Sequence, residues 1–137
     1  MKESSGVVVK VNGKCLICKR SPGNTYPNSW AIPMGRIEKG ETPEDAAYRE
    51  FEEEMGVELV GRIKNYAKIN WLDNNGNKKN IVHVFIYDTD RKLIPNLKDA
   101  VDGFEHSVCE YMTLNQINDL DMTSALKEIL IKILKKN

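Results

Sequence analysis

The segment Arg49–Gly56, REFEEEMG, places four glutamates among six consecutive residues, between an arginine and a glycine. On a helix, Glu50, Glu53 and Glu54 fall within an arc of about 100°. Like charges at this spacing destabilise a helix, and acidic groups near its C-terminal end oppose the helix dipole. A bound hard cation such as Mg²⁺ reverses the sign of both effects, because it prefers oxygen ligands. The segment therefore indicates a helix whose carboxylates serve a cation, while Glu52 points elsewhere, into solvent.

The residues around this segment predict a helix from Pro43 to Met55. Thr42 is a good N-cap, and Pro43 fits the first turn because its missing N–H breaks no helical bond. Gly56 can end the helix in the left-handed conformation. A stripe beside the carboxylates has an apolar residue at every fourth position: Ala47, Phe51 and Met55. We expect the helix to dock this stripe on a sheet and to present the three carboxylates along another side.

The remaining chain combines hairpins with two further helices. Asn12-Gly13 is a strong hairpin signal between two β-rich runs, and Thr113 with Gln116 fits a capping box. The expected strands are 5–10, 14–19, 61–72, 80–89 and a short one at 109–112; the expected helices are 43–55, 113–120 and 123–136. Hairpins mixed with helices favour an α/β sandwich around a mixed sheet. At 137 residues, the chain 1–137 is expected to form one domain.

The charge balance argues against two broad classes of partner. Lys plus Arg and Asp plus Glu both number 20, so the net charge is zero. A general nucleic-acid binder or an anionic-membrane binder needs a basic surface; a local basic patch on a substrate cleft remains compatible with this composition. The chain shows no signal-peptide pattern and no stretch of about 20 apolar residues. We therefore expect a cytoplasmic protein without a membrane partner.

The three cysteines, Cys15, Cys18 and Cys109, do not suggest a disulfide framework. Cys15 and Cys18 lie three apart in a predicted strand, so their side chains point to opposite faces. A second C-x-x-C pair, which a zinc site would use, is absent from the sequence. The expectation is three ordinary reduced cysteines.

Wider context makes the acidic segment more specific. From Gly35 to Val57 the chain reads G-x5-E-x7-R-E-F-x-E-E-x-G-V. This pattern resembles the signature of the Nudix hydrolase family, G-x5-E-x7-R-E-U-x-E-E-x-G-U, where U is a bulky apolar residue. Phe51 is an aromatic substitute at the first U position. The preceding hairpin and the closing helix also resemble the family's layout, so the resemblance covers most of the chain.

The resemblance implies a Nudix-type α/β/α sandwich and a reaction. Family members use water and divalent cations to cleave a nucleoside diphosphate linked to another group. By this resemblance Glu50, Glu53 and Glu54 bind Mg²⁺, with Mn²⁺ as the alternative ion, and Arg49 orients Glu50. Glu41 supports the arrangement from the preceding loop, and the backbone near Gly35 completes the site.

The catalytic base has two candidates. Glu50 is one, and Glu105 is the other, because the 8-oxo-dGTP-cleaving branch has a further glutamate in the corresponding segment. Glu105 is also a candidate metal ligand; Asp99, Asp102 and Glu110 are the fallbacks. Arg20, or else Lys19, ends the second strand where that branch places a phosphate-contacting arginine.

The substrate is expected to be a small nucleotide. The markers of ADP-ribose, dinucleoside-polyphosphate and NADH hydrolases are absent downstream of the signature, which favours a nucleoside triphosphate cleaved to monophosphate and pyrophosphate. Two departures weaken a specific match to oxidised guanine: Met34 replaces a glycine of the usual lead-in, and the guanine-reading asparagine is missing. Dinucleoside polyphosphates, nucleotide sugars, capped RNA ends and a non-hydrolysing nucleotide sensor remain alternatives. Nudix enzymes often dimerise, so a homodimer is a further expectation from the resemblance.

Overall fold

The computed structural model describes residues 2–21, 29–72, 78–98 and 106–135. Within these residues the chain forms three helices and one seven-stranded sheet. The strands are β1 (Lys2–Val11), β2 (Lys14–Arg20), β3 (Trp30–Ala31), β4 (Met34–Arg36), β5 (Lys64–Leu72), β6 (Lys78–Asp88) and β7 (His106–Met112). The helices are α1 (Pro43–Met55), α2 (Leu114–Asn118) and α3 (Ser124–Lys135).

The sheet is mixed, as expected. Its main path runs β3-β2-β1-β6-β5, while β4 also pairs with β1 and β7 also pairs with β2. The β1–β6 pair is parallel, whereas the other pairs are antiparallel. β5 therefore ends the path, with β6 as its neighbour in the sheet.

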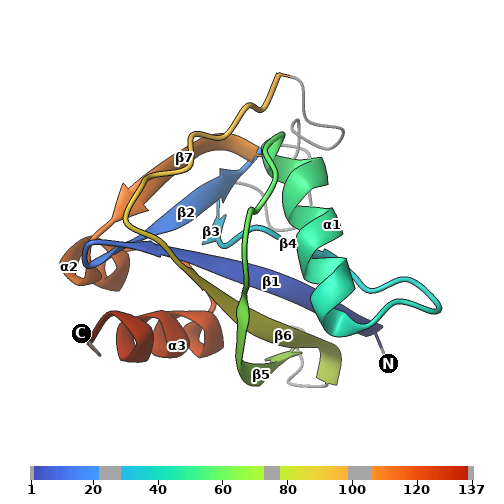
Figure 1. Cartoon of the computed structure of the whole chain (residues 1–137). Coiled ribbons are helices and arrows are strands. Elements are labelled where there is room, and N and C mark those ends of the chain that lie inside the picture. The colour runs from blue at the N-terminus through green and yellow to red at the C-terminus, as the bar shows by residue number, and fades with distance from the viewer. Residues whose placement is uncertain (1, 22–28, 73–77, 99–105, 136–137) are drawn as a thin grey trace.

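Helices α1 and α3 cover opposite faces of the sheet (Figure 1). Because side chains alternate along a strand, β1 contributes to both sides. Val8 packs with the α3 residues Leu126 and Leu130, and Val7 packs with Phe51 and Met55 of α1. This layered arrangement confirms the predicted α/β/α sandwich.

Helix α1 has the predicted bounds and the predicted ends. The Thr42 hydroxyl accepts a hydrogen bond from the Asp45 backbone N–H at 3.1 Å. Gly56 adopts φ 71°, in the left-handed region, and its N–H bonds the Glu52 carbonyl at 2.9 Å. Thr113 and Gln116 likewise form the predicted capping box of α2. The two caps of α1, at Thr42 and Gly56, define where the helix with the acidic segment begins and ends.

Helix α3 buries an apolar stripe, which consists of Leu126, Ile129, Leu130, Ile133 and Leu134. Its last turn carries Lys132 and Lys135, which complement the negative end of the helix dipole. No helix in the described part of the chain is long and apolar enough to cross a membrane.

Two short strands escape prediction, and four predicted strands begin elsewhere than expected: β1, β6 and β7 begin earlier, at Lys2, Lys78 and His106, and β5 begins later, at Lys64. β3 and β4 contain two and three residues on either side of Ile32-Pro33, which is too short for a strand pattern to develop. β7 begins at His106 rather than at residue 109. Pairing with β1 nevertheless fixes β4, because Gly35 lies opposite Ser5.

The expectation of three reduced cysteines is wrong. Cys18 and Cys109 face each other in the antiparallel β2–β7 pair and form a disulfide across 91 residues of sequence. Each sulfur also lies near the Met55 sulfur, at 3.8 Å and 4.0 Å. Cys15 remains free and buried on the opposite face, and burial raises the pKa of its thiol to about 12. Local spacing correctly separated Cys15 from Cys18, but it contained no information on the pairing of β2 with β7.

Candidate active site

Arg49 is the centre of a carboxylate cluster on α1. Its Nε and Nη2 donate to the two Glu41 oxygens at 2.6 Å and 2.9 Å, a bidentate pair. Its Nη1 donates to Glu50 Oε1 at 2.8 Å and to Glu53 Oε2 at 3.0 Å. One guanidinium therefore joins the loop before the helix to two carboxylates of the helix itself.

The loop side of this cluster is tied to the backbone. Arg49 Nη2 also donates to the Arg36 carbonyl at 3.0 Å. Glu41 accepts from the Glu38 N–H at 2.9 Å, and the Glu38 carbonyl accepts from the Glu41 N–H at 3.0 Å. The Glu38 carboxylate lies 3.7 Å from Arg49. The loop after β4 thus has a fixed position relative to the middle of α1.

The cluster shifts the pKa values of Glu41 and Arg49. Hydrogen bonds from Arg49, then from the Glu38 N–H, lower the pKa of Glu41 from 4.5 to about 2. The same pair raises the pKa of Arg49, with Glu41 as the largest contributor and Glu50 following. Both groups therefore stay charged at neutral pH, and the cluster remains ionic.

Glu50 packs directly against Gly35 of β4. A Cβ atom at Gly35 would overlap the Glu50 carboxylate, including its Oε2. The Glu50 side chain is 14% exposed. Glycine at this position is consequently required by space, since its φ is not in the left-handed region that favours glycine.

Glu54 lies on the sheet side of α1, whereas we expected it beside Glu50 and Glu53, along a side other than the docked apolar stripe. It is 3% exposed, and its Oε1 accepts a hydrogen bond from the Met34 N–H at 3.1 Å. The carboxylate thus faces the sheet side of α1, where it ties β4 to the helix. Glu53 is 32% exposed, and Glu52 is exposed as expected.

The donor set suits a hard divalent cation. Glu50, Glu53 and Glu54 offer carboxylate oxygens, the ligand type that Mg²⁺ prefers. Each carboxylate has about four acceptor positions, so a bond to Arg49 or to Met34 does not exhaust its capacity. Among the described residues, no three His, Cys, Asp or Glu side chains are already grouped closely enough to hold a metal ion. Arg49, which donates to both Glu50 and Glu53, lies between them.

Some of the other candidate residues lie within the described part of the chain, and the rest lie outside it. Arg20 ends β2 opposite His106 of β7, and the Lys19 ammonium lies 5.9 Å from the centre of the Trp30 ring. Glu110 is exposed on β7. Glu105, Asp99 and Asp102 lie outside the described residues, so their roles stay predictions.

Sequence reasoning missed three partners of the cluster: the Glu38 carboxylate, the Arg36 carbonyl and the Met34 N–H. Backbone groups carry no side-chain signal, and Glu38 is one of several loop glutamates. The spacing from Glu38 to Glu41, which closes a one-turn loop, is the feature that could have indicated it.

Comparison with known proteins identifies the family. Residues 2–133 match the NUDIX domain. This match spans nearly the whole chain, and the chain belongs to the NUDIX family. The chain spans about half the length of several of the curated relatives that it matches.

Two curated relatives and one solved structure illustrate the similarity. The chain is 29% identical to a nucleoside triphosphatase NudI from Enterobacter sp. (strain 638), over 88% of this chain and 87% of that protein. It is 32% identical to an RNA pyrophosphohydrolase from a Nitratiruptor species, over 62% of this chain and only 57% of the relative. The fold matches the crystal structure of a MutT NUDIX hydrolase from Burkholderia pseudomallei, with a TM-score of 0.75, 24% identity, and coverage of 96% and 95% of the two chains.

Proposed function

We propose that this protein is a divalent-cation-dependent pyrophosphohydrolase that cleaves a nucleoside triphosphate to a monophosphate and pyrophosphate. The carboxylate cluster around Arg49 carries the proposal for the chemistry. In this cluster the Arg49 guanidinium donates hydrogen bonds to Glu41, Glu50 and Glu53. The similarity to a nucleoside triphosphatase over most of both chains supports the substrate class.

Glu50, Glu53 and Glu54 would hold Mg²⁺, or Mn²⁺ in its place. The ion, when bound, supplies charge neutralisation at phosphate oxygens and lowers the pKa of water. Arg49 keeps one oxygen of Glu50 and one of Glu53 in place. Gly35 leaves room for Glu50 beside β4, and the Met34 N–H orients Glu54.

A carboxylate is needed to take the proton from the attacking water. Glu50 is our first candidate, because it is largely shielded from solvent and held by Arg49. Glu105 is the second candidate, as base or as metal ligand. Arg20 is proposed to contact a phosphate group of the substrate.

A second substrate class is favoured by one observation. RNA pyrophosphohydrolases are among the relatives with identities above 30%, although the chain spans about half of their length. Triphosphate at the 5′ end of an RNA has the same anhydride bonds as a free nucleoside triphosphate. The same carboxylates would serve both substrates.

The test is a product analysis with Mg²⁺. The panel contains the common nucleoside triphosphates, 8-oxo-dGTP, ADP-ribose, a dinucleoside tetraphosphate and a 5′-triphosphate RNA. We expect pyrophosphate and a monophosphate from at least one nucleoside triphosphate, and no product when EDTA replaces Mg²⁺.

Each other outcome would change the proposal. Release of pyrophosphate from the RNA alone would transfer the function to RNA 5′ ends. Cleavage of ADP-ribose or of the tetraphosphate alone would retain the chemistry and replace the substrate. Tight nucleotide binding without turnover of any compound would contradict hydrolysis and favour a sensor.

A further inference from the structure

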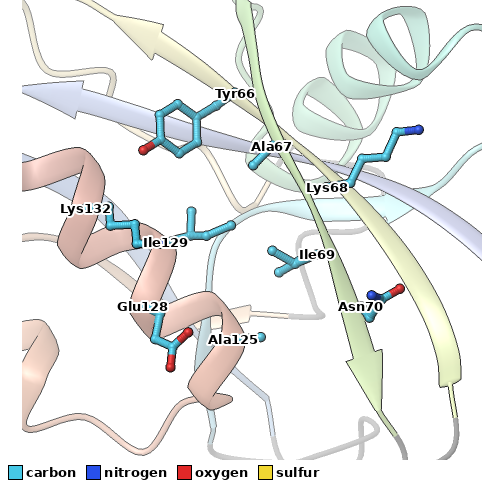
Figure 2. Close-up of a pocket in the computed structure, with 9 residues that line it drawn as sticks. All are labelled: Tyr66, Ala67, Lys68, Ile69, Asn70, Ala125, Glu128, Ile129 and Lys132. Atoms are coloured by element: carbon cyan, nitrogen blue, oxygen red, sulfur yellow. The ribbon is translucent and has the colours of Figure 1, made fainter.

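A groove separates the edge strand β5 from helix α3, on the face opposite α1. One part of it is a cavity of about 670 Å³ between residues 66–70 of β5 and the side of α3 that carries Ala125, Glu128, Ile129 and Lys132 (Figure 2). A second cavity of about 280 Å³ continues past Lys64 and Ile133. Tyr66 lines both cavities. We call the two together the β5–α3 groove.

A β-bulge directs Tyr66 into this groove. Asn65 pairs with Phe85 and Ala67 pairs with the adjacent Val84, so Tyr66 is an extra residue in the ladder. Figure 2 shows Tyr66, Ala67 and Ile69 on the side of β5 that faces α3, with Lys68 on the other side. Bulges often re-aim a side chain near a functional site. Here the bulge places an aromatic ring at the junction of the two cavities.

The lining of the groove is mainly apolar at the base and basic at the rim. Ile69, Ile86 and Ile129 contribute to its base. The charged residues that line it are Lys10, Arg62, Lys64 and Lys132, against Asp88 and Glu128, while the Lys68 side chain points away from α3. Helix α1 shows the reverse balance, with Arg49 as its one basic residue and six acidic ones. The zero net charge of the chain thus conceals an acidic face and a basic groove on opposite sides of the sheet.

We propose that the β5–α3 groove binds a short stretch of single-stranded nucleic acid. Proteins that bind single strands combine a basic track for the phosphates with aromatic side chains on which bases stack. Arg62 and Lys64 supply the track near one end, Lys132 extends it along α3, and Tyr66 supplies the stacking surface. This site is distinct from the carboxylate cluster, which lies on α1.

A second copy of the chain fits the groove less well. β5 is an edge strand, and an edge strand can pair with its counterpart in another copy. However, it carries Lys64 and Lys68 and no acidic residue, so pairing of two copies would bring like charges together. An acidic peptide would satisfy the charges but would not use the ring of Tyr66.

The test measures binding alone. A short oligouridylate with a 5′-hydroxyl and a 3′ fluorescent label is titrated with the protein in EDTA, and its anisotropy is recorded. This probe has no phosphoric anhydride, so the result does not depend on the proposed hydrolysis. We expect saturable binding that weakens with salt, because each phosphate contact to a single strand changes the logarithmic slope by about 0.7.

Variants locate the site. Arg62→Glu/Lys64→Glu should weaken binding at least about tenfold and reduce the salt slope, whereas the matched reversal Lys2→Glu/Lys98→Glu, at exposed positions outside the groove, should not. Tyr66→Leu should weaken binding about tenfold, and Tyr66→Phe should retain it. Thermal melting of every variant checks that the fold is kept.

Three results would overturn the proposal. The first is a lack of binding to the oligouridylate, and the second is equal loss in both double-reversal variants. The third is equal competition by polyglutamate of the same length, with a polyglutamate affinity that Tyr66→Leu does not change. This result would make the groove a peptide-binding or general anion-binding surface. A dimer that Arg62→Glu/Lys64→Glu alters, without RNA binding, would assign the groove to a second copy.

Discussion

Helices α1 and α3 lie on opposite faces of one sheet and differ in the charges of their last turns. α3 has a buried apolar stripe and two lysines in its last turn, as an ordinary surface helix should. α1 carries no basic residue in its last turn and places Glu52, Glu53 and Glu54 there instead. Both helices are anchored in a core of the sandwich, but α1 is anchored in spite of its charges.

The difference separates the features of α1 that stabilise the fold from the carboxylates that we propose to serve chemistry. Phe51 and Met55 hold α1 on the sheet, as Leu126 and Leu130 hold α3. Repulsion between the carboxylates costs a few tenths of a kcal/mol for each neighbouring pair, as for other like-charge pairs on a helix. Arg49 offsets part of that repulsion, and a bound cation would offset more. Departure from ordinary helix chemistry therefore marks the part of the fold that we propose to be catalytic.

The largest expected effect separates two neighbouring glutamates of α1. Glu53→Gln should lower kcat by at least about a hundredfold, because it removes a charged group that we propose as a ligand of the cation. Unfolding free energy should change by less than about 1 kcal/mol, since Glu53 is a partly exposed member of an ion pair. Steady-state kinetics and urea unfolding measure the two quantities.

Glu52→Gln is the matched control, because Glu52 lies one residue away and is exposed. Its kcat should stay within about twofold of the wild type. If both variants lose activity equally, the assignment of a special role to Glu53 is wrong.

The corresponding change in α3 should affect stability rather than chemistry. Leu130 is fully buried, and Leu130→Ala should lower the unfolding free energy by about 2–5 kcal/mol. Leu130→Met, which nearly conserves volume, should cost less than about 1.5 kcal/mol. Below the melting transition, kcat should stay near wild type in both; a loss of kcat in the folded protein would mean that α3 takes part in catalysis.

Gly35→Ala tests whether Glu50 of α1 needs the space that β4 leaves for it. The added Cβ would overlap the Glu50 carboxylate, so the rate should fall about tenfold as Glu50 is displaced. Gly13→Ala is the control, because a Cβ there meets open space. It should cost about 1 kcal/mol of stability through its positive φ, with no effect on kcat. Equal kcat values for wild type and Gly35→Ala would show that Glu50 does not need its present position.

The smallest effect concerns pH. The folded-state pKa of Glu41, about 2, lies below its ordinary value of 4.5. Its ion pair with Arg49 therefore contributes stability above pH 4.5 and loses it as the pH falls from 4.5 toward 2. In Glu41→Gln, unfolding free energy should fall less steeply across this window than in wild type, as urea unfolding at stepped pH would show. Parallel curves would argue that the pair adds nothing.

The sequence was sufficient where a short stretch carries its own signals. Thr42, Pro43 and Gly56 define both ends of α1, and Asn12-Gly13 defines the first hairpin, with φ values of 49° and 79°. The apolar stripe of α3 likewise follows from periodicity alone. The spacing from Gly35 to Val57 identified the family without any structure.

The rest depended on contacts between distant segments. Cys18 meets Cys109 only because β7 pairs with β2, and the buried Glu54 has the Met34 N–H as a partner only because β4 lies beside α1. The β5–α3 groove needs Tyr66 to be the extra residue of a bulge, which depends on the register with β6. Such registers are set by tertiary packing, and no local pattern in the sequence specifies them.

The most direct test of the central claim is a titration with Mn²⁺, followed by electron paramagnetic resonance of the free ion. Wild-type protein and the Glu52→Gln control should bind Mn²⁺ with similar affinity, and Glu53→Gln should bind it at least about tenfold more weakly. Mg²⁺ should compete for the same site. Equal binding by wild type and Glu53→Gln, or no binding by either, would contradict the account of the α1 carboxylates as a cation site.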